Sequence, residues 1–200
     1  MAIASDLFLG GSETTSKSMM YAVAFLIHNA KVQAKVQEEV SKIDKDVITW
    51  TDKDSLPYTE ATLHEVWSLG NIAPYGPPRI TSGPVNIAGY DFPKGTVVMH
   101  STYSVHMDKK YWGDPEIFRP ERFMTEDGKF KPDERTIPFG IGKRRCLGES
   151  LARMENFLFL ANLMKNFRFS AAEGVMPELR PLAGLTNGPP PFYTKIDGVN

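Results

Sequence analysis

The single cysteine of the chain, Cys146, lies in the segment PFGIGKRRCLG, between glycines and directly after three basic residues. Nearby cations and the N-terminus of a helix stabilise a thiolate, and a helical pattern starts just after Cys146. Gly140, Gly142 and Gly148 allow tight turns and let a flat ligand come close to the sulfur. The segment therefore favours an ionised sulfur that acts as a ligand or a nucleophile, although a lone cysteine can also be a buried apolar residue.

Length and composition describe one globular domain. The chain has 200 residues, of which 42% are hydrophobic and 24% charged, so it can bury a core and is not disordered. A net charge of -1 gives no overall attraction to nucleic acid or to an acidic membrane. One cysteine excludes an internal disulfide, which fits a reducing compartment.

The N-terminal stretch shows neither a membrane span nor a secretory signal. Its longest apolar run, residues 21–27, is far shorter than the roughly 20 residues that cross a bilayer. No basic segment precedes a small-residue cleavage site. The first residues already follow a helical apolar pattern without a cap, so we expect a helix cut in the middle and a chain that is part of a longer protein.

Two helices are expected in the first 43 residues. Over 3–27 apolar side chains occur on almost every side, which is typical of a buried helix. Valines at helical spacing then indicate an amphipathic surface helix. Its expected i,i+4 ion pairs are Lys35 with Glu39 and Glu38 with Lys42.

A third helix is expected over about 55–69, with Asp54 or Ser55 as its cap and Gly70-Asn71 as its end. Alternating residues around glycine and proline turns over 84–100 predict short hairpin strands. Strand ends are also expected in FRFS (167–170) and PPFYTKI (190–196).

The remaining segments are an irregular coil and a last helix. Residues 107–138 lack a sustained period but are rich in aromatic residues, which predicts an ordered coil. A helix over about 147–165 is expected to carry an ion pair of Glu149 with Arg153. Its apolar stripe comprises Leu147, Leu151, Met154, Leu158 and Ala161. The sequence therefore predicts a mixed α and β fold dominated by helices, with small β hairpins.

The segment FGIGKRRCLG (139–148) resembles, at every fixed position, the haem-binding loop of the cytochrome P450 family. The resemblance implies that Cys146 is the thiolate ligand of the iron of haem b, iron protoporphyrin IX. It implies that Arg144 pairs with a haem propionate, because the forked donors of arginine suit a carboxylate. It also places Arg79 near a propionate and Phe139 near the sulfur, where it limits water.

The segment GGSETT (10–15) is similar to the oxygen-activation motif of the same family. The resemblance implies that Glu13 and Thr14 relay protons to the reacting oxygen, and that the glycines leave room for dioxygen against the helix. The other interpretation is that Ser12 caps a helix that starts at residue 13.

The segment FRPERF (118–123) resembles the family's meander, in which Arg122 pairs with a glutamate on the third helix, here Glu65. The family carries Glu-x-x-Arg at this point, whereas this chain has Ser68 in place of the arginine. The resemblance therefore predicts either a weakened Glu65/Arg122 pair or a defective copy.

The resemblance extends over almost the whole chain, so residues 1–200 are expected to be a partial cytochrome P450 domain, its C-terminal part, with the meander before the cysteine loop. It is strongest with the animal microsomal branch. It implies a haem-thiolate monooxygenase that hydroxylates an apolar small molecule with O2 and with electrons from NADPH. The implied partners are an NADPH-dependent flavin reductase and cytochrome b5, without nucleic acid. The implied location of the full-length protein is the cytosolic face of the endoplasmic reticulum membrane, through an anchor that this chain lacks.

Two alternatives remain open. One is a non-catalytic, truncated remnant that does not hold haem. The other is a thiol nucleophile enzyme, which needs a histidine base near Cys146 in an arrangement that the sequence does not show. His100 and His106 are interpreted as ordinary hydrogen-bonded histidines. Tyr75 and Leu185, in the loops 71–76 and 184–189, are candidates for the substrate pocket.

Overall fold

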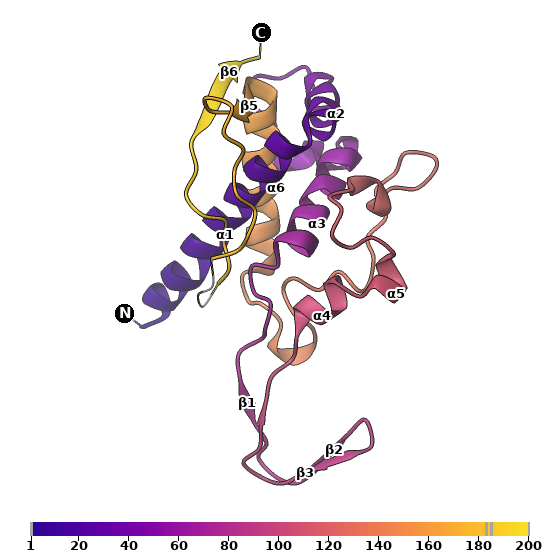
Figure 1. Cartoon of the computed structure of the whole chain (residues 1–200), viewed down its shortest axis with the longest axis vertical. Coiled ribbons are helices and arrows are strands. Elements are labelled where there is room, and N and C mark those ends of the chain that lie inside the picture. Colours follow the sequence, from indigo (N-terminus) through magenta and orange to yellow (C-terminus); the bar gives the residue numbers. More distant parts are fainter. Residues whose placement is uncertain (1, 183, 185, 200) are drawn as a thin grey trace.

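Four long helices, α1 (Ala2–His28), α2 (Ala30–Ser41), α3 (Pro57–Gly70) and α6 (Glu149–Asn166), form the body of the molecule (Figure 1). The structure is a computed structural model that describes residues 2–182, 184 and 186–199. Helix α6 packs against the other three. None of the helices in this described part combines the length and hydropathy that crossing a bilayer requires.

Short elements connect these helices. A turn of 3-10 helix, η1 (Trp50–Ser55), leads into α3. Helices α4 (Thr102–His106) and α5 (Lys109–Trp112), with the 3-10 turn η2 (Pro120–Phe123), lie in the irregular segment beside α3. A further 3-10 turn, η3 (Gly142–Arg144), precedes α6. The ordered coil with little regular structure is as predicted.

The strands form three antiparallel pairs. Arg79 lies opposite Val98, Val85 lies opposite Phe92, and a third pair joins the two strands near the C-terminus. The first two pairs make an arm that projects from the body at the end away from the C-terminus (Figure 1). The pairs are β1 (Arg79–Ile80) with β4 (Val97–Val98), β2 (Val85–Ile87) with β3 (Tyr90–Phe92), and β5 (Phe167–Ala171) with β6 (Thr194–Gly198). The helix-dominated fold with small hairpins is confirmed.

Aromatic and branched side chains from all four long helices share one core. Phe25 of α1 stacks on Tyr21 and on Phe118, with ring centroids 5.5 and 4.9 Å apart. Full burial of such a side chain contributes on the order of 2 kcal/mol. Buried residues of the other helices in this core are Val36, Val40, Leu63, Val66, Trp67, Phe157, Leu160 and Met164.

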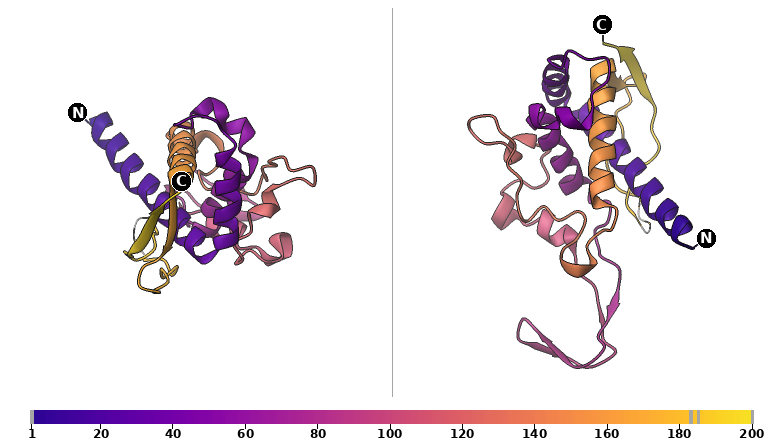
Figure 2. Two further views of the ribbon diagram at one scale, coloured as in Figure 1. Left: turned by 90° about the horizontal axis from the view of Figure 1, so that it is seen from above. Right: turned by 180° about the vertical axis from the view of Figure 1, so that it is seen from behind.

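Helix α1 is buried only over its second half. Residues 3–13 are exposed, and among them Ile3 and Phe8 are 76% and 73% exposed. The prediction of a helix buried over 3–27 is therefore wrong for these residues, because no described element packs against them. Figure 2 shows the N-terminal half of α1 extending away from the body. The helix also runs through Ser12, so the interpretation of Ser12 as a cap is wrong.

Helix α3 takes its N-terminal cap from α2. Glu39 accepts hydrogen bonds from the backbone N–H groups of Tyr58 (2.8 Å) and Thr59 (2.7 Å). Neither Asp54 nor Ser55 caps the helix, because it starts after them and Leu56 occupies the N-cap position. A carboxylate from a neighbouring helix thus satisfies the first amides of α3 and complements its dipole.

Charged side chains of α2 form ion pairs with residues of other elements where such residues lie within reach. Lys35 binds Glu121 at 2.6 Å, so the predicted pair of Lys35 with Glu39 is wrong. Glu38 and Lys42, which face solvent, form the predicted pair at 3.1 Å.

His106 joins the end of α3 to the segment before the cysteine loop. The Ile137 N–H donates to His106 Nε2 (3.0 Å), so Nδ1 carries the proton that bonds Asn71 Oδ1 (3.0 Å). Asn71 ends α3 with a φ of 40°, as its predicted stop requires. Burial lowers the pKa of His106 to about 4.

This histidine is expected to make folding sensitive to acid. Its pKa is about 4 in the folded chain against an ordinary 6.5, so the unfolded chain binds more protons between these values. The neutral ring therefore contributes stability that is present above pH 6.5 and is lost as the pH falls towards 4, about 3 kcal/mol in total. Urea unfolding at pH 7 and pH 5 should show a smaller pH dependence in His106→Gln. The same pH dependence of stability in His106→Gln as in the original chain would contradict this role of His106.

Candidate functional site

The loop that carries Cys146 closes on itself through the backbone. The Cys146 N–H donates to the Phe139 carbonyl at 2.8 Å, across the turn η3. Gly140 and Gly142 have φ values of 74° and 73°, a region that side chains disfavour. The pattern of glycines around the cysteine thus has a direct structural cause. The thiol of Cys146 is exposed.

The surface around the sulfur is apolar and cationic. Ile141 and Leu147 flank Cys146 and are 70% and 91% exposed. Arg144 is exposed as well, and it forms no ion pair within the part of the chain that the structure describes. A Cβ on Gly148 would lie 4.0 Å from the Cys146 sulfur, so the glycine keeps one side of the thiol open. A soft ligand atom, apolar flanks and a free cation fit a flat, apolar group that carries carboxylates.

An ion network holds the loop from the side of α6. Glu149 binds Arg145 (2.5 Å) and Arg153 (3.0 Å), the latter as predicted. The Arg153 guanidinium lies over the rings of Trp67 and Phe139, at 4.9 and 5.0 Å. Phe139 is therefore packed between helices α3 and α6, which fixes the start of the loop.

Arg153 also binds a buried histidine of α3. It donates from Nη1 to His64 Nε2 at 3.1 Å. Burial, followed by the charge of Arg153, lowers the pKa of His64 to about 3, so the ring stays neutral. Sequence reasoning missed His64, although its position directly before Glu65 could have suggested it.

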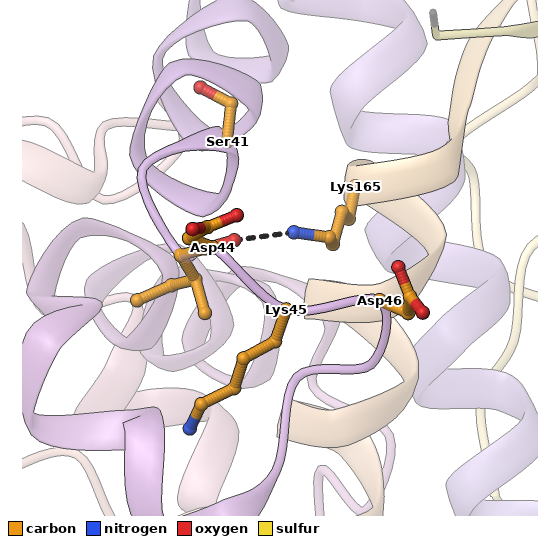
Figure 3. Close-up of a pocket in the computed structure, with 6 residues that line it drawn as sticks. Ser41, Asp44, Lys45, Asp46 and Lys165 are labelled. Carbon is orange, nitrogen blue, oxygen red and sulfur yellow. Dashed lines mark hydrogen bonds between the residues drawn. The ribbon is translucent and has the colours of Figure 1, made fainter.

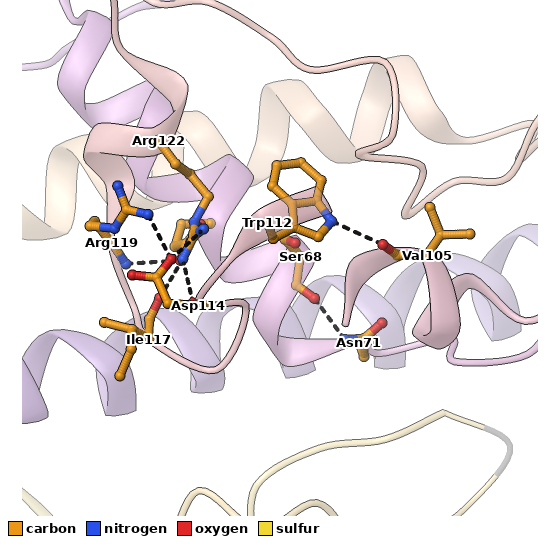
Figure 4. A network of polar contacts seen from close by, with 9 residues as sticks. Ser68, Asn71, Val105, Trp112, Asp114, Ile117, Arg119 and Arg122 are labelled. Atoms are coloured by element: carbon orange, nitrogen blue, oxygen red, sulfur yellow. Dashed lines mark hydrogen bonds and ion pairs between the residues drawn. The ribbon is translucent and has the colours of Figure 1, made fainter. Parts of the chain in front are cut away.

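Glu65 and Arg122 form the ion pair that the meander motif predicts. Arg122 Nε lies 2.9 Å from Glu65 Oε2, and both side chains are buried, at 7% and 2% exposure. Arg122 also donates to the carbonyls of Asp114 (3.0 Å) and Ile117 (2.8 Å), as Figure 4 shows. The Arg119 N–H donates to Glu65 Oε1 at 2.8 Å. Burial raises the pKa of Glu65 to about 7, against the opposing charge of Arg122.

Ser68 lies one turn after Glu65 and is buried. The Arg122 Nε–H donates its hydrogen bond to Glu65 Oε1 at 3.1 Å. Within the described part of the chain, Glu65 Oε2 therefore lies near this cation but accepts no hydrogen bond, so a second cation has an acceptor available. Ser68→Arg is therefore expected to stabilise the fold by about 1 kcal/mol, which corresponds to a rise of roughly 3 °C in Tm. Differential scanning calorimetry measures it, with Ser68→Met as a control for side-chain size. No rise beyond that of Ser68→Met would contradict the prediction.

Glu13 and Thr14 lie on α1, and no contact of the described residues joins them to the cysteine loop. The Thr14 hydroxyl donates to the Gly10 carbonyl at 2.7 Å. Glu13 forms an ion pair with Lys17 at 2.7 Å, and this partner holds the pKa of Glu13 below its usual range. Arg79 lies on β1, half-exposed and without an ion-pair partner in the described chain.

The two loops considered for substrate contact are joined to each other. The Asn187 N–H donates to the Ile72 carbonyl at 2.7 Å. Tyr75 is 59% exposed beside this junction. Leu185 lies outside the described residues.

A polar hollow of about 730 Å³ lies near the end of α2, between Asp44, Asp46 and Lys165 (Figure 3). Lys165 Nζ donates to the Ile43 carbonyl at 2.6 Å and so caps the chain reversal after α2. In the described chain no three acidic, histidine or cysteine side chains gather as a metal site, here or elsewhere.

Fold and loop together define a haem-thiolate class of protein: the chain belongs to the cytochrome P450 family, whose model matches residues 1–196. It is 42% identical to cytochrome P450 2U1 of Rattus norvegicus over 197 residues, which cover 97% of this chain and 37% of that protein. It is 40% identical to cytochrome P450 2L1 of Panulirus argus over 199 residues, 98% of this chain and 40% of that protein. The chain thus spans well under half the length of these relatives.

Solved structures agree with this assignment. A zebrafish cytochrome P450 with abiraterone has a TM-score of 0.90 and 34% sequence identity, and the match covers 98% of this chain and 48% of that one. The match to a structure of a zebrafish cytochrome P450 with progesterone has the same TM-score at 33% identity, with 96% and 45% covered. The sequence-based resemblance to this family is confirmed.

Proposed function

We propose that residues 1–200 form the haem-binding, C-terminal part of a cytochrome P450 monooxygenase that hydroxylates an apolar small molecule. The observation that carries the proposal is the closed loop that presents the Cys146 thiol between exposed apolar side chains and a free arginine. The family membership supports the class of reaction.

The residues of the loop have distinct tasks in this proposal. Cys146 provides the thiolate ligand, and Arg144 and Arg79 pair with the propionates. Ile141 and Leu147 would offer apolar contact to the group, and Phe139 would restrict water near the sulfur. When bound, haem b supplies the chemistry that activates O2 and inserts one oxygen atom into an apolar C–H bond.

Glu13 and Thr14, both on α1, relay protons in this proposal. The bond from Thr14 to the Gly10 carbonyl fixes the hydroxyl on one face of the helix. A Cβ on Gly10 or Gly11 would meet no atom within 4 Å, so open space lies beside both glycines in the described chain. The Glu13 carboxylate supplies a proton acceptor one residue before the hydroxyl.

The partners follow from the class of reaction. An NADPH-dependent flavin reductase, with cytochrome b5 as a second donor, provides electrons, and the exposed cation Lys143 offers an acidic partner a contact point. The apolar substrate class fits the progesterone bound to the zebrafish relative. The full-length protein is proposed to work at the cytosolic face of the endoplasmic reticulum membrane.

A second candidate function is a remnant that does not retain haem. The exposed apolar half of α1, with Ile3, Leu7, Phe8 and Leu9 at 57–76% exposure, favours it, because such surface promotes association rather than a stable monomer.

A haem titration of the purified chain separates the two candidates. The haem-loaded protein is reduced, treated with carbon monoxide, and its Soret band recorded beside its mass in solution. A red-shifted, thiolate-type band in a monomer is expected. A band like that of free haem, or haem found only in aggregates, would overturn the proposal in favour of the remnant.

A further inference from the structure

Lys17 connects helix α1 with a loop 169 positions away in the sequence. Its ammonium lies 2.7 Å from Glu13 Oε1, 2.7 Å from the Thr186 carbonyl oxygen and 2.8 Å from Thr186 Oγ1. A lysine ammonium has three N–H donors, so these three acceptors match its full capacity. The side chain is 21% exposed, so the contact lies partly out of solvent.

The loop leaves room for the lysine stem. A Cβ on Gly188 would lie 3.0 Å from Lys17 Cγ and Cδ, closer than real side chains approach without a shift. The same loop binds the other candidate substrate loop through the Asn187 N–H and the Ile72 carbonyl, at 2.7 Å. The Leu182 N–H donates to the Gly188 carbonyl at 2.8 Å and closes its far side. Lys17 therefore connects α1 directly to the loop that contains Thr186 and, through that loop, to the loop that contains Ile72.

The charge arrangement gives Lys17 a second effect. Glu13 is exposed, yet its hydrogen bond and charge interaction with Lys17 hold its pKa below the usual range. The carboxylate is therefore held in its ionised form, on the same turn of helix as Thr14.

We propose that Lys17 is a positioning residue that fixes the Thr186 loop to α1 and orients the Glu13 carboxylate in one geometry. This role rests on the proposed monooxygenase function. There, Lys17 sets the position of Glu13 and Thr14 on α1 relative to the two loops proposed to border the substrate. Lys17 acts through these groups and does not itself touch the reacting atoms.

Amide hydrogen exchange of Asn187 and Leu182 tests the tether in the chain without haem. In Lys17→Met, which keeps most of the stem, we expect the Asn187 amide to exchange roughly tenfold faster, because two charge-assisted hydrogen bonds to the loop are lost. Lys17→Arg should stay within about twofold of the original chain, because it retains the cation. Thr186→Val should give a smaller increase of roughly threefold, because only the hydroxyl contact is lost.

The matched control is Lys42→Met. It removes an i,i+4 pair with Glu38 that lies within one helix, so the Asn187 amide should keep its original rate. Equal Asn187 exchange in the original chain and in Lys17→Met would overturn the proposed tether.

The titration of the Glu13 carboxyl, followed by carbon-13 NMR, tests the orienting effect. In Lys17→Met its pKa should rise towards the usual value of a glutamate, which a role in packing alone would not produce. An unchanged titration would overturn this part. Both measurements are made without haem, so a missing thiolate band, which overturns the proposed function, leaves their outcome readable.

Discussion

Cys146→Ser is expected to abolish the red-shifted Soret band of the reduced, carbon monoxide-treated protein. A serine oxygen at neutral pH is a protonated hydroxyl and does not replace a thiolate as an iron ligand. The loop itself should keep its shape, because the backbone N–H of residue 146 supplies the bond to the Phe139 carbonyl. We therefore expect complete loss of the red-shifted Soret band with an unchanged far-ultraviolet circular dichroism spectrum.

Two neighbouring variants separate ligation from general damage to the loop. Ser150→Ala, in the exposed first turn of α6, should keep both the band and its intensity. Arg144→Met should keep the band position but weaken haem binding by roughly tenfold, because a charge-assisted contact to a carboxylate is lost. A thiolate-type band that persists in Cys146→Ser would disprove the assignment of the ligand.

Arg122→Leu is expected to lower the free energy of unfolding by about 3–5 kcal/mol, the largest effect on stability among these changes. The substitution leaves the Glu65 carboxylate, 2% exposed, without its cation. It also removes the donors to the carbonyls of Asp114 and Ile117. For a chain of this size the corresponding fall in Tm is roughly 10 °C. Urea unfolding at pH 7.5 measures the difference.

Arg180→Leu is the matched control for this prediction. Arg180 forms an ion pair with Glu178 on the surface, with 79% and 55% of the two side chains exposed. Such pairs contribute at most about 1 kcal/mol. Glu65→Leu combined with Arg122→Leu should recover part of the loss, because no buried charge is left alone. A cost for Arg122→Leu no larger than that for Arg180→Leu would count against the importance of the buried pair.

Features set by near neighbours in the chain could be predicted from sequence. The glycines of the cysteine loop, the end of α3 at Asn71 and the hairpin strands depend on local backbone preferences, and the structure shows each of them. The pair of Glu65 with Arg122 spans 57 positions, and it was found only through the family pattern.

Features set by distant partners could not be predicted. The i,i+4 spacing predicts Glu39 as the ion-pair partner of Lys35, but the lysine pairs with Glu121 instead. Likewise, apolar residues indicate a face without showing whether another element covers it. Leu147 and Leu151 of the expected stripe of α6 are exposed, whereas Phe157 and Leu160 are buried. The contact of Lys17 with Thr186 has no local sequence signal either.

The cap that Glu39 provides has a consequence for how the molecule opens. Since α3 has no capping side chain of its own, its first turn is complete only while α2 is docked against it. Fluctuations that separate α2 from α3 therefore also expose the amides of Tyr58 and Thr59. The two helices should behave as one cooperative unit in hydrogen exchange. Because Glu65 lies on α3, the amides around it should open with the same free energy as that unit.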